Sequence, residues 1–169
     1  MRILAYHRCV RGLGGMSVSE FLRRLDEYFI VQALHINYPD EAEPRRKGEF
    51  AMLLDENWYR LTIRDVCIDT SGDPVQSLDV SLLENYLLKP ILGIEDMRSD
   101  PRLDYVPGTS GLRTLVERAE EGWRLMLGCY PTSMQEMYTV ADNSLVMPPK
   151  STWFDPKVRS GIFLKLRRS

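Results

Sequence analysis

Apolar and polar residues alternate along this chain with two different periods, which predicts a mixture of strands and helices. Residues 59–64 alternate strictly between apolar and polar positions, as in a strand with one buried and one solvated face. Residues 18–25 instead repeat their apolar positions at helical spacing. Ser17 precedes this repeat and Glu20 follows three residues later, which is the pattern of a capping box at a helix start.

The same reasoning applied to the whole chain predicts strands and helices in mixed order. Strands are expected at 2–6, 29–36, 49–54, 58–64, 103–106, 123–129 and 161–166. Helices are expected at 18–25, 79–88, 110–121 and 132–143. We therefore expect an α+β fold in a single domain over residues 1–169, with a largely antiparallel mixed sheet packed with three to four helices.

Three local details accompany these elements. Residues 55–57 are expected to form a three-residue hairpin turn with Asn57 in the left-handed conformation. Asp79 is expected to cap its helix, and residues 144–160 to form an irregular loop. In the last helix Thr132 and Gln135 would form a capping box. Its buried stripe is expected to be Met134, Met137, Tyr138 and Ala141.

Length and composition narrow the class of protein. A chain of 169 residues is long enough to bury one core, and no apolar run approaches the ~20 residues that span a bilayer. The start of the chain lacks a signal-peptide pattern, so we expect a cytoplasmic protein. The three cysteines are far apart and the two histidines have no partners at metal spacing. We therefore predict no disulfide framework, no metal site and no cofactor.

The charge is distributed unevenly around a net value of −2. Residues 1–15 carry three arginines and no acid, and residues 150–169 carry six basic residues and one acid, whereas residues 16–149 are strongly acidic. The overall sign argues against nucleic acid as a partner, and nothing predicts a membrane partner. The two basic ends leave room for a local anion site.

The densest polar chemistry lies between Met147 and Gly161, where three prolines stiffen the chain. Lysine, arginine and hydroxyl groups on a rigid loop suit a phosphate or carboxylate. The candidate anion ligands there, together with one arginine near the start of the chain, are Lys150, Ser151, Thr152, Lys157, Arg159 and Arg8. The alternative is structural, with the prolines shaping the loop, its two aromatic residues anchored in the core and its charges solvated.

Two further segments could carry chemistry. Residues 6–15 form a basic, glycine-bearing stretch before a helix, in which His7 could act as an acid or base. The alternative for His7 is a hydrogen-bonded structural role. Residues 95–104 hold four acids and two arginines but lack calcium-loop spacing, so ion pairing is favoured over a divalent cation.

Several stretches together resemble a known family. They are Tyr6–Val10 with Leu13 and Gly14, Gly48–Phe50, Trp58–Leu61, Ser77–Val80, Leu92–Ile94, Tyr130–Thr132 and Met147–Lys157. In this order they resemble the carboxy-terminal part of a widespread prokaryotic family of uncharacterised proteins, domain of unknown function 1015, over nearly the whole chain. The resemblance implies a longer protein with a further amino-terminal half, and this chain would be an excised domain or a short form. Family members usually have Asn where His7 stands, which weakens a catalytic role for His7.

Two functions follow as alternatives, and neither establishes an enzyme. The first is an anionic small-molecule binding domain of a larger uncharacterised cytosolic protein. The second is a structural or assembly domain without a ligand of its own, which contacts the amino-terminal half or a second copy. The resemblance also implies a remote link to ParB-like proteins, some of which phosphorylate free serine, so part of a small-molecule kinase is a remote alternative.

Overall fold

The structure, a computed structural model, describes residues 2–68 and 72–156 of the chain. Its strands are β1 (Arg2–Val10), β2 (Phe29–Leu34), β3 (Glu49–Leu54), β4 (Asn57–Ile63), β5 (Leu103–Pro107), β6 (Leu125–Cys129) and β7 (Thr152–Asp155). Its helices are α1 (Val18–Leu25), α2 (Asp79–Leu83), α3 (Arg113–Glu120) and α4 (Met134–Asp142). Short turns of helix are η1 (Pro39–Ala42), η2 (Asp65–Cys67), η3 (Glu84–Leu88) and η4 (Gly108–Ser110).

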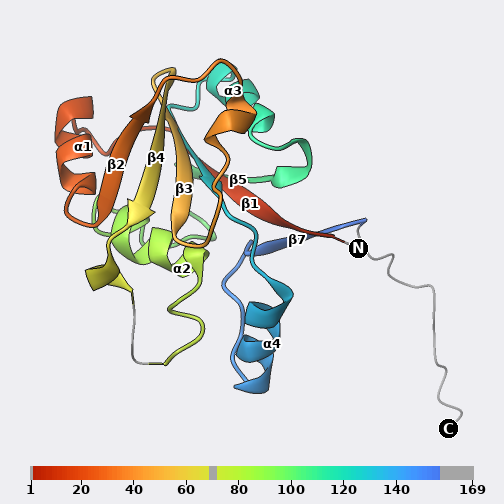
Figure 1. Cartoon of the computed structure of the whole chain (residues 1–169). Coiled ribbons are helices and arrows are strands. Elements are labelled where there is room, and N and C mark those ends of the chain that lie inside the picture. Colours follow the sequence, from red (N-terminus) through yellow and green to blue (C-terminus); the bar gives the residue numbers. More distant parts are fainter. Residues whose placement is uncertain (1, 69–71, 157–169) are drawn as a thin grey trace, which may run out of the picture.

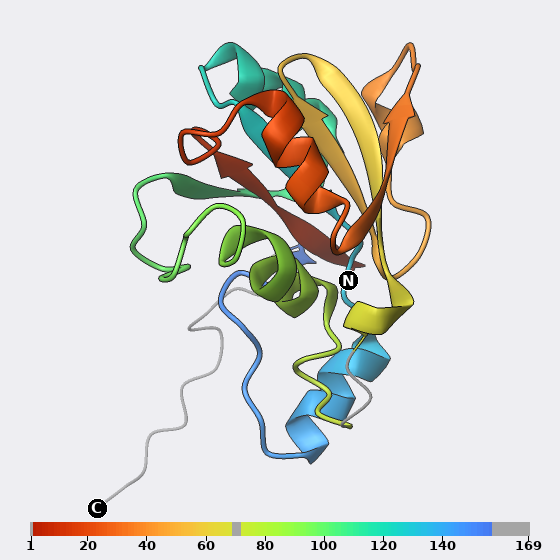
Figure 2. The ribbon, with the colours of Figure 1, turned by 90° about the vertical axis from the view of Figure 1, so that its left-hand side faces the viewer.

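The strands form one seven-stranded sheet in the order β2-β4-β3-β6-β1-β5, with β7 also paired to β1. Every strand pair in this sheet is antiparallel. Figures 1 and 2 show α1 and α2 on one face of the sheet and α3 on the other. The α+β fold class with an antiparallel sheet and three to four helices is therefore confirmed.

Each face of the sheet buries its own apolar core. On the face covered by α1 and α2, Phe21 and Leu25 pack with Phe29 and Phe50, whose rings meet edge to face with centroids 6.0 Å apart. On the other face Leu112 and Leu115, at the start of α3, pack against the sheet. This two-sided burial explains why all six residues of β3 are buried. None of the helices in the described part of the chain is both long and apolar enough to cross a bilayer.

The first strand is longer than the sequence suggests and holds the sheet together. The predicted strand ends at residue 6, but β1 continues to Val10 through His7 and Arg8. It pairs with β5 and β6 at its carboxyl end and with β7 at its amino end. The backbone hydrogen bonds to three partner strands stabilise an extended conformation where polar side chains argued for a loop.

The hairpin between β3 and β4 differs from the prediction. Leu54 pairs directly with Asn57, so the turn has two residues, Asp55 and Glu56. Both are left-handed, with φ of 44° and 66°, whereas Asn57 belongs to β4. Positive φ at both central residues is the geometry that matches the twist of a two-residue hairpin.

Residues 79–88 form a helix as predicted, but the role of Asp79 is different. The cap position is Leu78, and Asp79 is the first helical residue. Its buried carboxylate accepts hydrogen bonds from the backbone N–H of Gly48 at 2.9 and 3.1 Å. After Leu83 the helix widens into the π-helical turn η3.

The last described elements depart furthest from the prediction. Ser133 and Glu136 form the capping box of α4, one residue after the expected pair. The expected buried stripe is wrong, because Met134 and Tyr138 are 40% and 55% exposed and only Val140 of this helix is buried. Figure 1 shows α4 standing below the sheet, away from α1 and α3. The expected loop 144–160 contains β7, and the strand expected at 161–166 lies outside the described residues.

Candidate functional site

Arg8 lies in the carboxyl half of β1 and is almost completely buried, with 3% of its surface exposed. Its guanidinium donates hydrogen bonds to the carbonyl oxygens of Tyr6 and Lys150, the latter at 3.4 Å. A third contact reaches Cys129 Sγ at 3.5 Å, and the ring of Tyr105 lies 5.4 Å from the guanidinium carbon. The cation is thus surrounded by dipoles and an aromatic ring.

The charge of Arg8 has no carboxylate partner in the part of the chain that the structure describes. None of the ion pairs within residues 2–68 and 72–156 includes Arg8. Its Nε has no hydrogen-bond partner among the same residues and is shielded from solvent. A buried ion is costly unless a counter-charge or full hydrogen bonding compensates it. The guanidinium of Arg8 is thus a buried cation whose compensation, among the described residues, comes from dipoles and an aromatic ring alone.

The surrounding groups respond to this charge. Burial raises the pKa of the Cys129 thiol, and the positive charge of Arg8 opposes that rise. Burial also raises the pKa of Tyr105, again against the effect of Arg8. Both side chains are therefore uncharged at neutral pH, and neither supplies the missing negative charge.

Lys150 contributes a second cation at the edge of this region. It is exposed and left-handed, with φ of 56°, and its ammonium lies 5.3 Å from the centre of the Tyr6 ring. The other contact of that ring is Trp153 of β7, edge to face at 5.7 Å between centroids. Tyr6 thus contacts both cations, the buried guanidinium of Arg8 through its carbonyl and the exposed ammonium of Lys150 through its ring. We call Tyr6, Arg8, Tyr105, Cys129 and Lys150 the Arg8 corner.

The remaining predicted ligands are less close to this corner. Ser151 is buried and its hydroxyl donates to the carbonyl of Pro148, so it stabilises its own loop. Thr152 is half-buried in β7, opposite Ala5 of β1. Lys157 and Arg159 lie outside the described residues. Of the six predicted residues, the structure brings Arg8 and Lys150 together.

Sequence reasoning missed the aromatic and sulfur groups of the corner. The sequence pattern predicts a strand that ends at Tyr6, whereas β1 continues through Arg8 to Val10. Tyr105 and Cys129 come from the neighbouring strands β5 and β6, where Tyr105 pairs with Arg8 directly. In a strand that continues past residue 6, the side chains of Tyr6, Arg8 and Val10 share one face, and this period of two is the sequence signal for a longer β1.

His7 faces the opposite side of β1. Its Nδ1 accepts the backbone N–H of Cys129 at 3.2 Å. Burial, and then the charge of Arg8, lower the pKa of His7 to about 4, so its imidazole is neutral at pH 7. His7 contacts the backbone of Cys129 and the thiol pKa is raised, so the two do not form a thiolate–imidazolium pair.

The acid-rich segment 95–104 is held by ion pairs and turn hydrogen bonds. Arg102 pairs with Asp100 at 2.6 Å, and Asp104 pairs with Arg118 of α3 at 3.2 Å. Asp96 accepts the hydroxyl of Ser99 at 2.5 Å. Among the described residues, no group of three or more His, Cys, Asp or Glu side chains is arranged to hold a metal ion.

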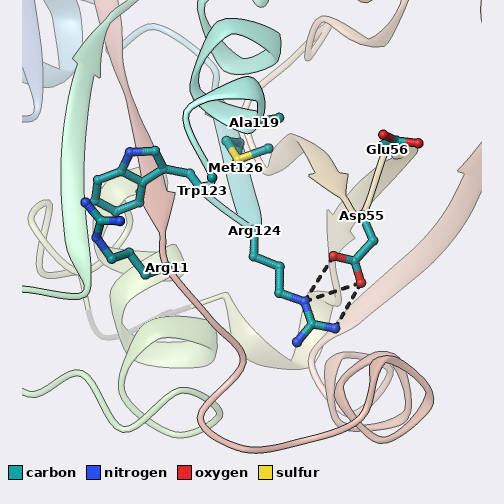
Figure 3. Close-up of a pocket in the computed structure, with 8 residues that line it drawn as sticks. Arg11, Asp55, Glu56, Ala119, Trp123, Arg124 and Met126 are labelled. Carbon is teal, nitrogen blue, oxygen red and sulfur yellow. Dashed lines mark hydrogen bonds and ion pairs between the residues drawn. The ribbon is translucent and has the colours of Figure 1, made fainter.

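A surface hollow of about 520 Å³ lies just beyond the carboxyl end of β1, beside the β3–β4 turn (Figure 3). Arg11 stacks on Trp123 there, with its guanidinium carbon 4.3 Å from the ring centre. Arg124 binds both carboxylate oxygens of Asp55, at 3.0 Å to each. Arg124 has a carboxylate partner and Arg11 is exposed to solvent, whereas Arg8 is buried without a carboxylate partner among the described residues. We therefore place the candidate site at the Arg8 corner.

Residues 1–81 match the sequence model of a family described as "Protein of unknown function (DUF1015)". This segment is similar to DUF1015 sequences. The resemblance inferred from the motifs is thereby confirmed over the DUF1015 segment, which includes Tyr6 and Arg8. Lys150 and the Met147–Lys157 stretch lie outside the matched residues. No curated protein matches the chain.

Solved structures similar to this chain include a free serine kinase in complex with AMP, at 12% identity and a TM-score of 0.48. A mutant of the free serine kinase in complex with ADP is 14% identical with a TM-score of 0.49. Both alignments cover 90% of this chain and 53% of the other. A conserved hypothetical protein from Pyrococcus furiosus is 11% identical with a TM-score of 0.49, over 90% of this chain and 55% of that one. The chain therefore spans about half the length of these structures, and likenesses at these scores carry no conclusion about activity.

Proposed function

We propose that this domain binds a small anion, bearing a phosphate or a carboxylate, at the Arg8 corner. The observation that supports the proposal is the buried guanidinium of Arg8, which has no carboxylate partner among the described residues. An anion held there would compensate a charge that the described protein groups leave uncompensated. The proposal names a ligand class and no reaction.

Arginine suits this role better than lysine because its planar fork donates parallel hydrogen bonds to two oxygens of a carboxylate or phosphate. At the Arg8 corner Nη1 and Nη2 donate to the carbonyls of Tyr6 and Lys150, which fixes the orientation of the guanidinium, and Nε has no partner among the described residues and would donate to the anion. The exposed ammonium of Lys150 would attract the ligand and bind its outer oxygens. We retain Thr152, Lys157 and Arg159 as further proposed contacts, and Ser151 as a residue that shapes the loop.

The proposed setting is the cytosol, within a longer protein. Cys9, Cys67 and Cys129 are all buried and free, which fits a reducing compartment.

Isothermal titration against inorganic phosphate, nucleotides, phosphorylated amino acids and dicarboxylates tests the proposal. We expect Lys150→Met to weaken binding about threefold to tenfold, because an exposed charge is partly screened by solvent. Arg8→Gln should weaken binding more than tenfold, since a charge-assisted hydrogen bond in a buried site is worth about 1.5–3 kcal/mol. Arg23→Gln, on the exposed side of α1, is the matched control and should leave binding unchanged.

The variants must be folded for the comparison to count, so thermal unfolding without ligand is measured for each. Lys150 is exposed, and its loss should leave the unfolding midpoint in place even if Arg8→Gln lowers it. The proposal fails if none of the four ligand classes binds the unsubstituted protein. It also fails if binding is the same in Lys150→Met and Arg23→Gln.

A second candidate function is assembly, and the surface of α4 favours it. Leu145 and Val146, just after this helix, are 42% and 84% exposed. Met134 and Tyr138, on the helix itself, are also exposed. Several exposed apolar groups on and beside one helix are typical of a protein contact surface. We propose the further half of longer DUF1015 proteins as the partner, tested by co-purification with that half. Light scattering of the chain alone would reveal self-association instead, and a monomer that ignores the further half would contradict this candidate.

A further inference from the structure

A second, smaller cavity lies on the face of β1 opposite the Arg8 corner. Its volume is about 160 Å³, close to the cavity of about 150 Å³ that binds benzene in an engineered protein core. Its wall is mostly apolar, with one buried imidazole and one carboxylate at the rim. The residues that line it include Leu4, His7, Glu43, Gly108 and Leu112.

The proton of the His7 imidazole is on the nitrogen that lines this cavity. Nδ1 accepts the backbone N–H of Cys129 and therefore carries no proton. In a neutral imidazole the other nitrogen must then be the donor. His7 Nε2 is buried and has no hydrogen-bond partner within residues 2–68 and 72–156. A buried donor without an acceptor is unfavourable, so a guest that accepts from Nε2 gains that hydrogen bond in full.

Gly108 keeps the space beside this donor free of side chains. A Cβ at this position would lie 2.9 Å from His7 Nε2 and 3.0 Å from the carbonyl oxygen of Ala5. The backbone of Gly108 is not left-handed, so its conformation does not itself require glycine. Glycine is required at this position because a Cβ would collide with His7 Nε2 and the Ala5 carbonyl oxygen.

The electrostatics of the cavity select the charge of the guest. Glu43 is exposed at the rim and repels anions. His7 is a donor without a positive charge at neutral pH. The wall formed by Leu4 and Leu112 offers no further hydrogen bonds from its side chains. An uncharged guest with one acceptor and an apolar body fits these three conditions.

We propose that this cavity is a binding site for a small uncharged molecule, or the uncharged end of a larger one, whose carbonyl-type oxygen accepts the His7 Nε2 proton. The guest is of benzene size, and its apolar body packs against Leu4 and Leu112. The side chains of His7 and Arg8 project to opposite sides of β1, so the cavity is distinct from the guanidinium of Arg8, although Cys129 borders both. The proposal stands whether or not the Arg8 corner binds an anion.

Cyclopentanone and cyclopentane are a matched pair of probes, since the two rings differ by one carbonyl oxygen. NMR titration with ¹⁵N-labelled histidine should show the Nε2-protonated tautomer, and cyclopentanone should shift its Nε2 resonance. We expect cyclopentanone to bind about tenfold more tightly than cyclopentane, the typical value of one buried hydrogen bond. Acetate should not compete with cyclopentanone.

His7→Asn separates the two roles of the imidazole. The Asn side-chain oxygen can take the place of Nδ1 and still accept the Cys129 N–H, while the shorter amide NH₂ does not reach the position of Nε2. Cyclopentanone should then bind this variant about tenfold more weakly, and cyclopentane should bind it unchanged. Equal affinity of the two probes for the unsubstituted protein, a proton on Nδ1, or unchanged cyclopentanone binding in His7→Asn would each overturn the proposal.

A size test on β1 supplies a second variant with its own control. Leu4→Phe enlarges a side chain that lines the cavity and should abolish cyclopentanone binding. Ile3→Phe makes the same kind of change at a half-buried neighbour that does not line it, and should leave binding intact. Binding that survives Leu4→Phe, or is lost equally in both, places the probe elsewhere and overturns the assignment.

Discussion

The carboxylate of Asp79 accepts the backbone N–H of Gly48 at 2.9 Å, which joins the first turn of α2 to the loop before β3. The same loop pairs Lys47 with Glu136 of α4 at 2.7 Å. Burial raises the pKa of Asp79 to about 7, against the lowering effects of the Gly48 hydrogen bond and of Lys47. This junction therefore titrates within the physiological range.

The pH dependence of stability should contain two opposing contributions. Asp79 binds its proton more tightly in the folded than in the unfolded chain, so its contribution to the free energy of unfolding falls as pH rises from about 4 to 7. His7, with a folded pKa of about 4, contributes stability that rises from about pH 4 to 6.5. We expect Asp79→Asn to show stability rising with pH in this window, and His7→Asn to show it falling. Each slope is at most about 1.4 kcal/mol per pH unit in urea unfolding.

Backbone strain gives a prediction at Gly48 itself. Its φ is 81°, and a Cβ there would lie 3.0 Å from the Cγ2 atom of Ile63. Gly48→Ala should lower the free energy of unfolding by about 1–2 kcal/mol, because a left-handed L-residue is costly. Gly12→Ala is the control, since open space surrounds that position and its φ is ordinary. Urea unfolding that ranks the two variants equally would contradict the prediction.

The β3–β4 turn should be improvable. Glu56 is exposed and left-handed, with φ of 66°, where a type I′ turn favours glycine. Glu56→Gly should raise the free energy of unfolding by up to about 1 kcal/mol. Glu56→Gln removes only the charge and should have little effect. A thermal midpoint that falls in Glu56→Gly while Glu56→Gln is neutral would show that the turn is not strained.

Helix α4 should open independently of the sheet. Val140 is the only residue of α4 that is buried, and it packs with Leu78 and Val80. Val140→Ser should accelerate amide hydrogen exchange in α4 at least tenfold and leave the exchange of β3 unchanged, because removing this contact costs about 2 kcal/mol locally. Tyr138→Ser, at an exposed position of the same helix, should leave both rates unchanged. Equal protection of α4 in the two variants would contradict this.

The sequence predicts where most helices and strands lie better than it predicts which of their faces are buried. The alternation in residues 59–64 and the cap at Ser17 depend on neighbouring residues alone, and both lie within elements the structure contains. The stripe of α4 failed because helical spacing shows which residues share a face but not whether another element covers it. The cap at Ser133 was misplaced by one residue because Thr132 and Ser133 offer overlapping patterns, and Glu136 also pairs with Lys47.

The Arg8 corner could be predicted only in part. The sequence placed Arg8 and Lys150 in one anion site from their charge, and their proximity depends on a contact across 142 positions of the chain. The continuation of β1 through His7 and Arg8 is only weakly indicated by the sequence, because adjacent polar residues usually end a buried strand. Their burial depends on β5, β6 and β7, which pair with β1 from distant parts of the sequence.

His7 and Arg8 are adjacent on one extended strand, so the pKa of the His7 imidazole depends on the charge state around the Arg8 guanidinium. Part of the downward pull on the histidine titration comes from the neighbouring positive charge, and an oxyanion docked on that charge would cancel this part. The histidine titration midpoint, followed by NMR, would then climb as phosphate is added. A single proton resonance on one side of the sheet would report occupancy on the other.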